Sequence, residues 1–226
     1  PVTRILGSSF VVGVGWRFRP PPVGVMRKRP NILVTGSVGA GKTSLCAMLA
    51  PMIGFEHIEV SARITEHKLY DEWDDKLNAS IFNEDLVLDY LEPFVQKGGC
   101  LLDFHSCDFF PESWIDHVSV IRVNNTVLYD RLKARGYDQR KIDENLQAEI
   151  FQVVLDDARE FYAPEIVTEL QNDTEEEQQL NIQTLSMWAA AWTPDMRPRR
   201  KAREDDDDSG RRARSRSPRG RASKRD

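Results

Sequence analysis

Residues 36–43 read GSVGAGKT and match the phosphate-binding pattern GxxxxGK[ST] in full. The pattern works between a strand and a helix, because its glycines let successive backbone N–H groups and a helix N-terminus face one phosphate group. An apolar run before it and an amphipathic stretch after it provide that setting. We therefore expect a nucleotide-binding α/β fold, with Lys42 at the β- and γ-phosphates and the Thr43 hydroxyl on Mg²⁺. The alternative is an ordinary glycine turn.

From Pro30 onward, short apolar runs alternate with longer amphipathic stretches, a pattern typical of a parallel sheet covered by helices. We predict one three-layer α/β domain over residues 30–194, with five strands in one parallel sheet. The expected strands are 31–35, 57–60, 100–104, 118–123 and 166–170. The expected helices are 42–50, 83–96, 126–135, 143–161 and 175–192.

The two ends of the chain differ in composition from this middle part. Residues 1–29 are rich in glycine and proline and carry basic but no acidic side chains, so we expect a disordered extension. This extension either lies upstream of a functional start near Met26 or is a transit peptide. Residues 195–226 hold few apolar side chains and are rich in arginine and serine, so we expect a disordered tail. The tail either solubilises the protein or serves nuclear targeting or RNA contact.

Two further classes of protein are excluded by the sequence. The longest apolar candidate, residues 5–16, is bounded by arginines and falls short of the ~18 residues that a membrane-spanning helix needs, so no membrane function is expected. Cys46, Cys100 and Cys107 form no CxxC pair, so neither a zinc knuckle nor a disulfide framework is expected. A reducing compartment is therefore the default.

A phosphate site of this kind also needs a carboxylate at the end of a neighbouring strand. Residues 99–103 read GCLLD, and a buried strand that ends in Asp103 would place this carboxylate beside the Mg²⁺. His105 follows two residues later and is expected on the same side, because side chains alternate along an extended segment. His105 either orients a water or a phosphoryl acceptor, or it is a hydrogen-bonded loop histidine.

Basic side chains gather in one short stretch of an otherwise acidic domain. Residues 30–196 carry 30 of the 36 acidic residues but 12 of the 31 basic ones, a net charge of −18. Binding a polyphosphate there requires positive charge at one place, which favours a short mobile lid over the nucleotide. The alternative is a solvated, salt-bridged helix end. The basic residues of this stretch are Arg131, Lys133, Arg135, Arg140 and Lys141.

Among proteins with such a loop, a small kinase fits better than a Ras-like GTPase, because the chain has no NKxD base-reading motif. A lid that supplies cations from the same chain is what a small kinase needs. The ~40 residues between the second and third expected strands would then form the acceptor-binding segment.

Three stretches carry a resemblance to a known family: PNILVTGSVGAGKTSL, LLDFHSCDFFPESW and LYDRLKARGYDQRKIDENLQAEIFQVV. Together they resemble the nuclear adenylate kinase isoenzyme 6 family, also known as the coilin-interacting nuclear ATPase. The resemblance runs from about residue 30 to residue 192. It implies a P-loop fold of the nucleoside monophosphate kinase type with a short lid, and it favours a functional role for His105, since the family's Walker B motif is Asp-x-His.

The resemblance also implies substrates and site residues. ATP and AMP would be the substrates and Mg²⁺ the metal, with Thr43 and Asp103 as metal ligands and His105 supporting ATP hydrolysis. A lid would span residues 134–144 and an acceptor segment about residues 59–82. The implied ATP-binding residues are Gly39, Ala40, Gly41, Lys42, Thr43, Ser44 and Arg135.

One departure from the family concerns the acceptor segment. The family's basic residue falls at Thr65 in this chain, and Arg63 lies two positions earlier. Either Arg63 contacts the monophosphate instead, or the acceptor binds weakly. A second departure, Val38 in place of the usual proline, should be tolerated because no side-chain chemistry is needed there.

Three functional hypotheses follow. The first is phosphoryl transfer from MgATP to AMP, with Lys42, Arg131 and Arg135 neutralising the transferring group. The second is an ATP-switched assembly factor that acts, as in the family, on small-ribosomal-subunit maturation through a small-subunit ribosomal protein and pre-rRNA in the nucleus, with the cytoplasm as a second location. The third is an RNA-binding protein that uses its basic tail.

Overall fold

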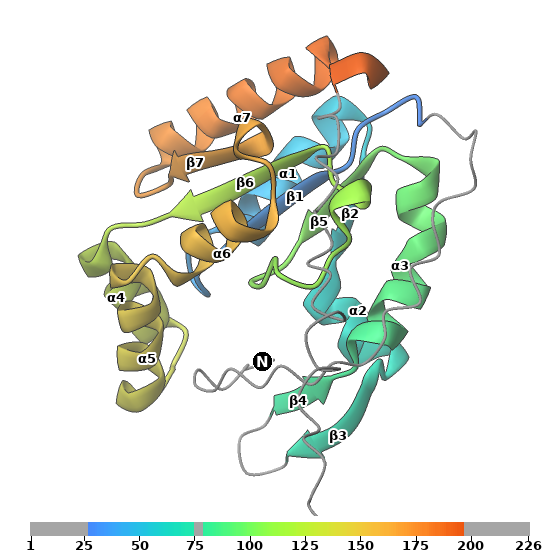
Figure 1. Ribbon diagram of the computed structural model, residues 1–226. Coiled ribbons are helices and arrows are strands. Elements are labelled where there is room, and N and C mark those ends of the chain that lie inside the picture. The colour runs from blue at the N-terminus through green and yellow to red at the C-terminus, as the bar shows by residue number, and fades with distance from the viewer. Residues whose placement is uncertain (1–26, 75–78, 197–226) are drawn as a thin grey trace, which may run out of the picture.

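A five-stranded parallel sheet forms the centre of the protein (Figure 1). The computed structural model describes residues 27–74 and 79–196. The strands of the sheet follow the order β2, β5, β1, β6, β7, and every neighbouring pair is parallel. Their bounds are β1 (Ile32–Gly36), β2 (Glu56–Glu59), β5 (Cys100–Asp103), β6 (His117–Arg122) and β7 (Val167–Gln171). The predicted parallel sheet is confirmed.

Helices cover both faces of this sheet. Leu33 of β1 packs in the cluster that includes Leu91 and Leu155 from the helices on one face, whereas Ile32 and Val34 pack in the cluster of the opposite face. This alternation follows from the period of two along a strand. α1 (Lys42–Ile53) and α7 (Glu175–Ala191) cover one face, and α3 (Glu84–Lys97) and α6 (Val153–Phe161) cover the other. The three-layer architecture is therefore confirmed.

The segment between β2 and α3 has more regular structure than the sequence indicated. α2 (Val60–His67) begins directly after β2, with no loop between them. An antiparallel hairpin follows, formed by β3 (Tyr70–Asp74) and β4 (Ala79–Phe82). The sequence expectation placed no element here, because the acidic run DEWDD lacks the alternation that predicts a strand.

A long helix expected over residues 143–161 is two helices in the structure. α5 (Gln139–Ile150) and α6 are separated by Phe151 and Gln152, and Gln152 has a left-handed backbone with φ 56°. Neither residue is glycine or proline, so no local signal marks the break. α4 (Asn125–Ala134) precedes α5, and the two helices lie together beside the carboxyl ends of the strands (Figure 1).

The N-terminal boundary of the domain lies earlier than the sequence suggested. Arg27 is buried and forms a 3.2 Å ion pair with the buried Asp116. Its guanidinium also donates to the carbonyl oxygens of Val95 and Ser113. Arg27 therefore packs into the folded domain, although it lies before the predicted boundary after residue 29. Residues 1–26 of the expected disordered extension and nearly all of the expected tail lie outside the described residues.

Within the two described ranges, no helix combines the length and the apolar character that crossing a membrane requires.

Candidate active site

The phosphate loop connects the central strand β1 to helix α1. Gly36 and Gly41 have φ angles of 138° and 100°, which L-residues with a side chain rarely adopt. A Cβ atom on Gly36 would lie 2.3 Å from the carbonyl oxygen of Ile121, and one on Gly41 would lie 2.5 Å from the side chain of Asn172. Gly41 is also the N-cap residue of α1 and offers no side chain to the first N–H groups of the helix. The loop thus presents backbone N–H groups as an anion site.

Lys42 is the first residue of α1 and is 8% exposed. Its amino group donates hydrogen bonds to the carbonyl oxygens of Gly36 (2.9 Å) and Ser37 (3.0 Å). Burial lowers the pKa of Lys42, and the nearby carboxylate of Asp103 opposes that shift. The amine is therefore held inside the loop, at the position from which it can meet a phosphate.

Asp103 ends β5 and stands beside β1, where its Cα is paired with that of Val34. Its side chain is 3% exposed, and among the described residues its Oδ2 atom has no hydrogen-bond partner. Thr43 is exposed in the first turn of α1 and lines the same cavity as Asp103. A carboxylate and a hydroxyl are oxygen ligands of the kind that Mg²⁺ prefers, so these two residues fit that ion.

A cavity of ≈ 370 Å³ lies at the carboxyl ends of the strands. Four parts of the chain line it: the phosphate loop with the start of α1, residues 103–106 after β5, the junction of β2 and α2, and the region from α4 to α6. The junction contributes Glu59 and Ser61. This position agrees with the general rule that ligands of open α/β sheets bind beyond the carboxyl ends of the strands.

His105 lies in this cavity together with Asp103. Its ring packs against Phe104, with the centroids 4.3 Å apart. Asp103 and His105 thus line one cavity, as does Phe104 between them, and the strand itself ends at Asp103. A histidine at this place can take part in proton transfer or orient a water.

The basic stretch divides into two groups. Arg135 and Lys141 line the cavity. Lys133 and Arg140 are not among the residues that line the cavity. Lys133 lies over the ring of Tyr129, and Arg140 forms an ion pair with Glu144 of the same helix. The short lid expected over residues 134–144 corresponds to the end of α4, the turn at residues 135–138 and the first half of α5.

Arg131 supports the phosphate loop from outside. Its guanidinium donates to the carbonyl oxygens of Ala40 (3.3 Å), Asn172 (3.0 Å) and Asp173 (3.0 Å). Arg131 is absent from the residues that line the cavity in the described part of the chain. These contacts hold the loop against the end of β7, and the role of Arg131 in neutralising a transferring group stays a prediction.

The predicted acceptor residue Arg63 lies on α2 and points elsewhere. Its guanidinium forms a 2.8 Å ion pair with Glu66, one turn further along the same helix. The cavity reaches the start of α2 through Ser61, and Arg63 is not among its lining residues. In this conformation Arg63 does not contact the space where an acceptor would bind.

Glu149 is a site residue that the sequence did not indicate. It is 3% exposed on α5, accepts a hydrogen bond from the Ser37 hydroxyl of the phosphate loop, and pairs with Arg122 at the end of β6. Asn172 was also missed, and its side-chain amide donates to Ala40 over 2.8 Å. A glutamate in a charged helix carries no local sign of burial, so only the fold reveals its role.

Comparisons with known proteins agree with this geometry. Residues 32–152 match a family model described as an AAA domain. An adenylate kinase isoenzyme 6 homolog from Drosophila melanogaster is 41% identical over 164 residues, which is 73% of this chain and 94% of that protein. A homolog of the same name from Dictyostelium discoideum is 44% identical over 168 residues, or 74% of this chain and 96% of that protein.

A solved structure supports the fold alone. Shikimate kinase from Acinetobacter baumannii, in complex with shikimate, superposes with a TM-score of 0.52 over 72% of this chain and 94% of its own, at 13% identity. The two relatives each match this chain over nearly their whole length, and the resemblance seen in the sequence is confirmed. The chain therefore belongs to the adenylate kinase isoenzyme 6 family.

Proposed function

We propose that the protein transfers the γ-phosphoryl group of MgATP to AMP, or to a related nucleoside monophosphate, in a reversible reaction. One observation carries the proposal: a single cavity joins the phosphate loop and Asp103 to Ser61 at the β2–α2 junction, with Arg135 of the lid at its side. Direct transfer needs donor and acceptor in one space with the reacting atoms in line. The names of the relatives support AMP as the acceptor.

The residues of the chain would act by positioning and by charge. The N–H groups of the loop hold the donor phosphates, and Lys42 meets the β- and γ-oxygens. Arg135 and Lys141 approach from the lid side and stabilise charge on the transferring group. Thr43 and Asp103 would hold Mg²⁺, which would supply positive charge that offsets the negative charge of the phosphates. No general base is required for such a transfer.

A second candidate function is ATP hydrolysis that drives a conformational switch. It is favoured by His105, which lines the cavity next to Asp103, where a water could be oriented. On this reading, closure on ATP changes the affinity for a small-subunit ribosomal protein or pre-rRNA in the nucleus, and hydrolysis releases that partner. The two activities are compatible on one site.

The amounts of product formed with and without AMP separate these functions. Transfer to AMP yields two ADP for each ATP consumed and no inorganic phosphate, whereas hydrolysis yields one ADP and one phosphate. We expect ADP formation to depend on AMP and phosphate release to stay low, as measured by chromatography of the nucleotides and a phosphate assay. The same assay with CMP and dAMP ranks the acceptors.

The opposite pattern would contradict the kinase proposal. The switch would be supported instead if the rate of ATP consumption were the same with and without AMP and if phosphate were released. The rate should then also rise when a ribosomal protein is added. Lys42→Ala, purified in the same way, serves as the control for the site, because the loss of its amine should lower the turnover ~100-fold or more.

A further inference from the structure

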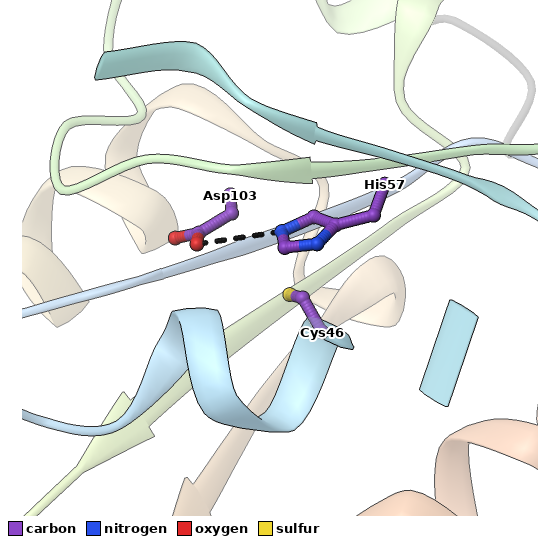
Figure 2. Close-up of side chains that lie close together, drawn as sticks. All are labelled: Cys46, His57 and Asp103. Carbon is purple, nitrogen blue, oxygen red and sulfur yellow. Dashed lines mark ion pairs between the residues drawn. The ribbon is translucent and has the colours of Figure 1, made fainter. Parts of the chain in front are cut away.

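Three side chains converge between α1 and the sheet, next to the nucleotide site. Figure 2 shows Cys46 from α1, His57 from β2 and Asp103 from β5 pointing toward one another. One ligand atom from each residue lies within 4.8 Å of the other two. The Nε2 atom of His57 is 3.6 Å from Oδ2 of Asp103.

The strand register explains why these residues meet. His57 is paired with Leu101, and Asp103 lies two residues after Leu101, so all three side chains leave the sheet on one face. Leu101 packs in the cluster that α1 covers, together with Cys46 of that helix. The group is therefore built by the fold, from three elements that are distant in sequence.

Two atoms of this group lack the partners that buried polar atoms normally have. Within the described ranges, neither Nε2 of His57 nor Oδ2 of Asp103 has a hydrogen-bond partner, although both atoms are buried. Asp103 is 3% exposed, and its distance to His57 is longer than a hydrogen bond. Buried polar atoms are nearly always satisfied, so this pair indicates a ligand that can bind both of them.

We infer that Cys46, His57 and Asp103 form a binding site for one thiophilic divalent cation of the zinc type. Sulfur, imidazole nitrogen and carboxylate oxygen are the ligand atoms of Zn²⁺, which binds them at ~2.0–2.3 Å in a tetrahedron. The fourth position is left for a water or a phosphate oxygen. Mg²⁺ prefers oxygen ligands alone and does not compete for the sulfur.

Cation binding requires the thiol of Cys46 to lose its proton. Burial raises the pKa of Cys46 well above its ordinary value, and Asp103 adds to that shift. On binding, the thiol proton goes to the solvent and the cation takes its place, so the charge of the thiolate is balanced by the metal. The absence of a CxxC pair in the sequence does not bear on such a site, because it uses only one cysteine.

Occupation of this site should oppose the reaction, a consequence that rests on the proposed function. Asp103 is the carboxylate that the proposed MgATP site uses, and here the zinc-type ion engages it. A thiophilic cation bound to Cys46 and His57 therefore withdraws Asp103 from Mg²⁺. The site makes the protein sensitive to the level of free zinc-type cations.

Spectroscopy with Co²⁺ tests the site without reference to activity. The full-length protein is titrated with Co²⁺ under reducing, nucleotide-free conditions. We expect a thiolate-to-cobalt charge-transfer band in the near ultraviolet that saturates at one equivalent, and displacement of the band by Zn²⁺. Cys46→Ser should abolish the band, and His57→Gln should weaken Co²⁺ binding at least ~100-fold.

Cys107→Ser is the matched control, because Cys107 is a buried free cysteine outside the cluster. This variant should keep the band. The inference is overturned if no band appears, if the band survives Cys46→Ser, or if it disappears with Cys107→Ser. Circular dichroism shows whether each variant is folded, and a folded Cys46→Ser with an unchanged band is decisive against the site.

Inhibition provides the second arm of the test. At fixed MgATP in excess, Zn²⁺ should inhibit the wild-type protein, and Cys46→Ser should require at least ~100-fold more Zn²⁺ for the same effect. Equal inhibition of both proteins would contradict the competition for Asp103. If the wild-type protein shows no phosphoryl transfer at all, the proposed function fails, and the Co²⁺ spectrum decides the metal site independently.

Discussion

Glu149 of α5 accepts a hydrogen bond from the hydroxyl of Ser37, which links the lid region to the phosphate loop across 112 positions of sequence. The same carboxylate pairs with Arg122 at the end of β6, and the backbone N–H of Val123 donates to it over 3.4 Å. One buried side chain thus ties the loop, the sheet and a helix of the lid together.

Replacing Glu149 by alanine should lower the free energy of unfolding by about 3 kcal/mol, because Arg122 and Ser37 lose a buried partner at once. Arg122 keeps its 3.0 Å contact with Glu169, which limits the loss. Urea unfolding measures the effect. Glu144→Ala is the matched control on the same helix, where the surface pair with Arg140 should contribute less than about 0.5 kcal/mol. Similar losses in the two variants would refute the role of Glu149.

Replacing Lys42 by alanine should reduce phosphoryl transfer ~100-fold or more, since the amine meets the phosphates only at this position. The rate is measured with purified protein in the AMP-dependent assay. Lys133→Ala provides the comparison, because Lys133 is exposed and lies over Tyr129, away from the cavity. Near-native turnover of the Lys42 variant would sink the assignment of the loop.

Arg131 and Arg135 lie one helical turn apart, and we expect their replacement by alanine to affect different properties: catalysis for Arg135 and stability for Arg131. Arg135→Ala should lower kcat/KM ~100-fold and leave the free energy of unfolding within about 0.5 kcal/mol, because this side chain is exposed at the cavity. Arg131→Ala should lower the stability by about 2 kcal/mol, because three backbone carbonyls lose a charged donor. Parallel kinetics and urea unfolding of both variants check the contrast, and the reverse assignment of effects would disprove it.

His117 should make stability depend on pH. The residue is 5% exposed, its ring lies 4.5 Å from that of Trp188, and burial lowers its pKa from 6.5 to about 4. Between these values the unfolded chain binds the proton and the folded protein does not. The contribution to stability is therefore complete above pH 6.5 and falls as the pH drops, by about 3 kcal/mol at pH 4.

The His117→Phe variant tests this dependence. Its free energy of unfolding should fall less steeply than that of the wild type between pH 6.5 and pH 4, because carboxylates contribute equally to both proteins. Urea midpoints at pH 7, 5 and 4 give the two curves. Curves that stay parallel would show that His117 is not the titrating group.

The parts of the fold that the sequence predicted are those determined by residues that are close together in the sequence. The glycines at 36 and 41 require backbone angles that other residues rarely adopt, so the loop was visible in the sequence. The central strands β1 and β5 are short buried runs rich in apolar residues, and Asp103 at the end of β5 follows from the same pattern. The position of the loop and that of the Asp103 carboxylate could therefore be predicted from local sequence.

The parts that the sequence did not predict depend on contacts between distant elements. Gln152 adopts a left-handed backbone conformation, which is usually found at glycine, and neither Phe151 nor Gln152 is a residue type that indicates the end of a helix. Arg131 was expected at the cavity with Arg135, but Asn172 and Ala40 provide carbonyls that draw it to the loop instead. The end of α5 and the position of the Arg131 side chain depend on tertiary contacts, which the sequence pattern alone does not reveal.

The hydrogen bonds of Lys42 to Gly36 and Ser37 bear on which anions the protein selects inside a cell. To bind the Lys42 amine, an anion must compete with the carbonyl oxygens of Gly36 and Ser37. A small anion such as orthophosphate gains little from this exchange, because the amine already has two good acceptors. A triphosphate can draw on the amide groups of the whole loop as well, so it outcompetes the carbonyls where orthophosphate does not. The hydrogen bonds that Lys42 already makes therefore favour a polyphosphate over orthophosphate at the loop.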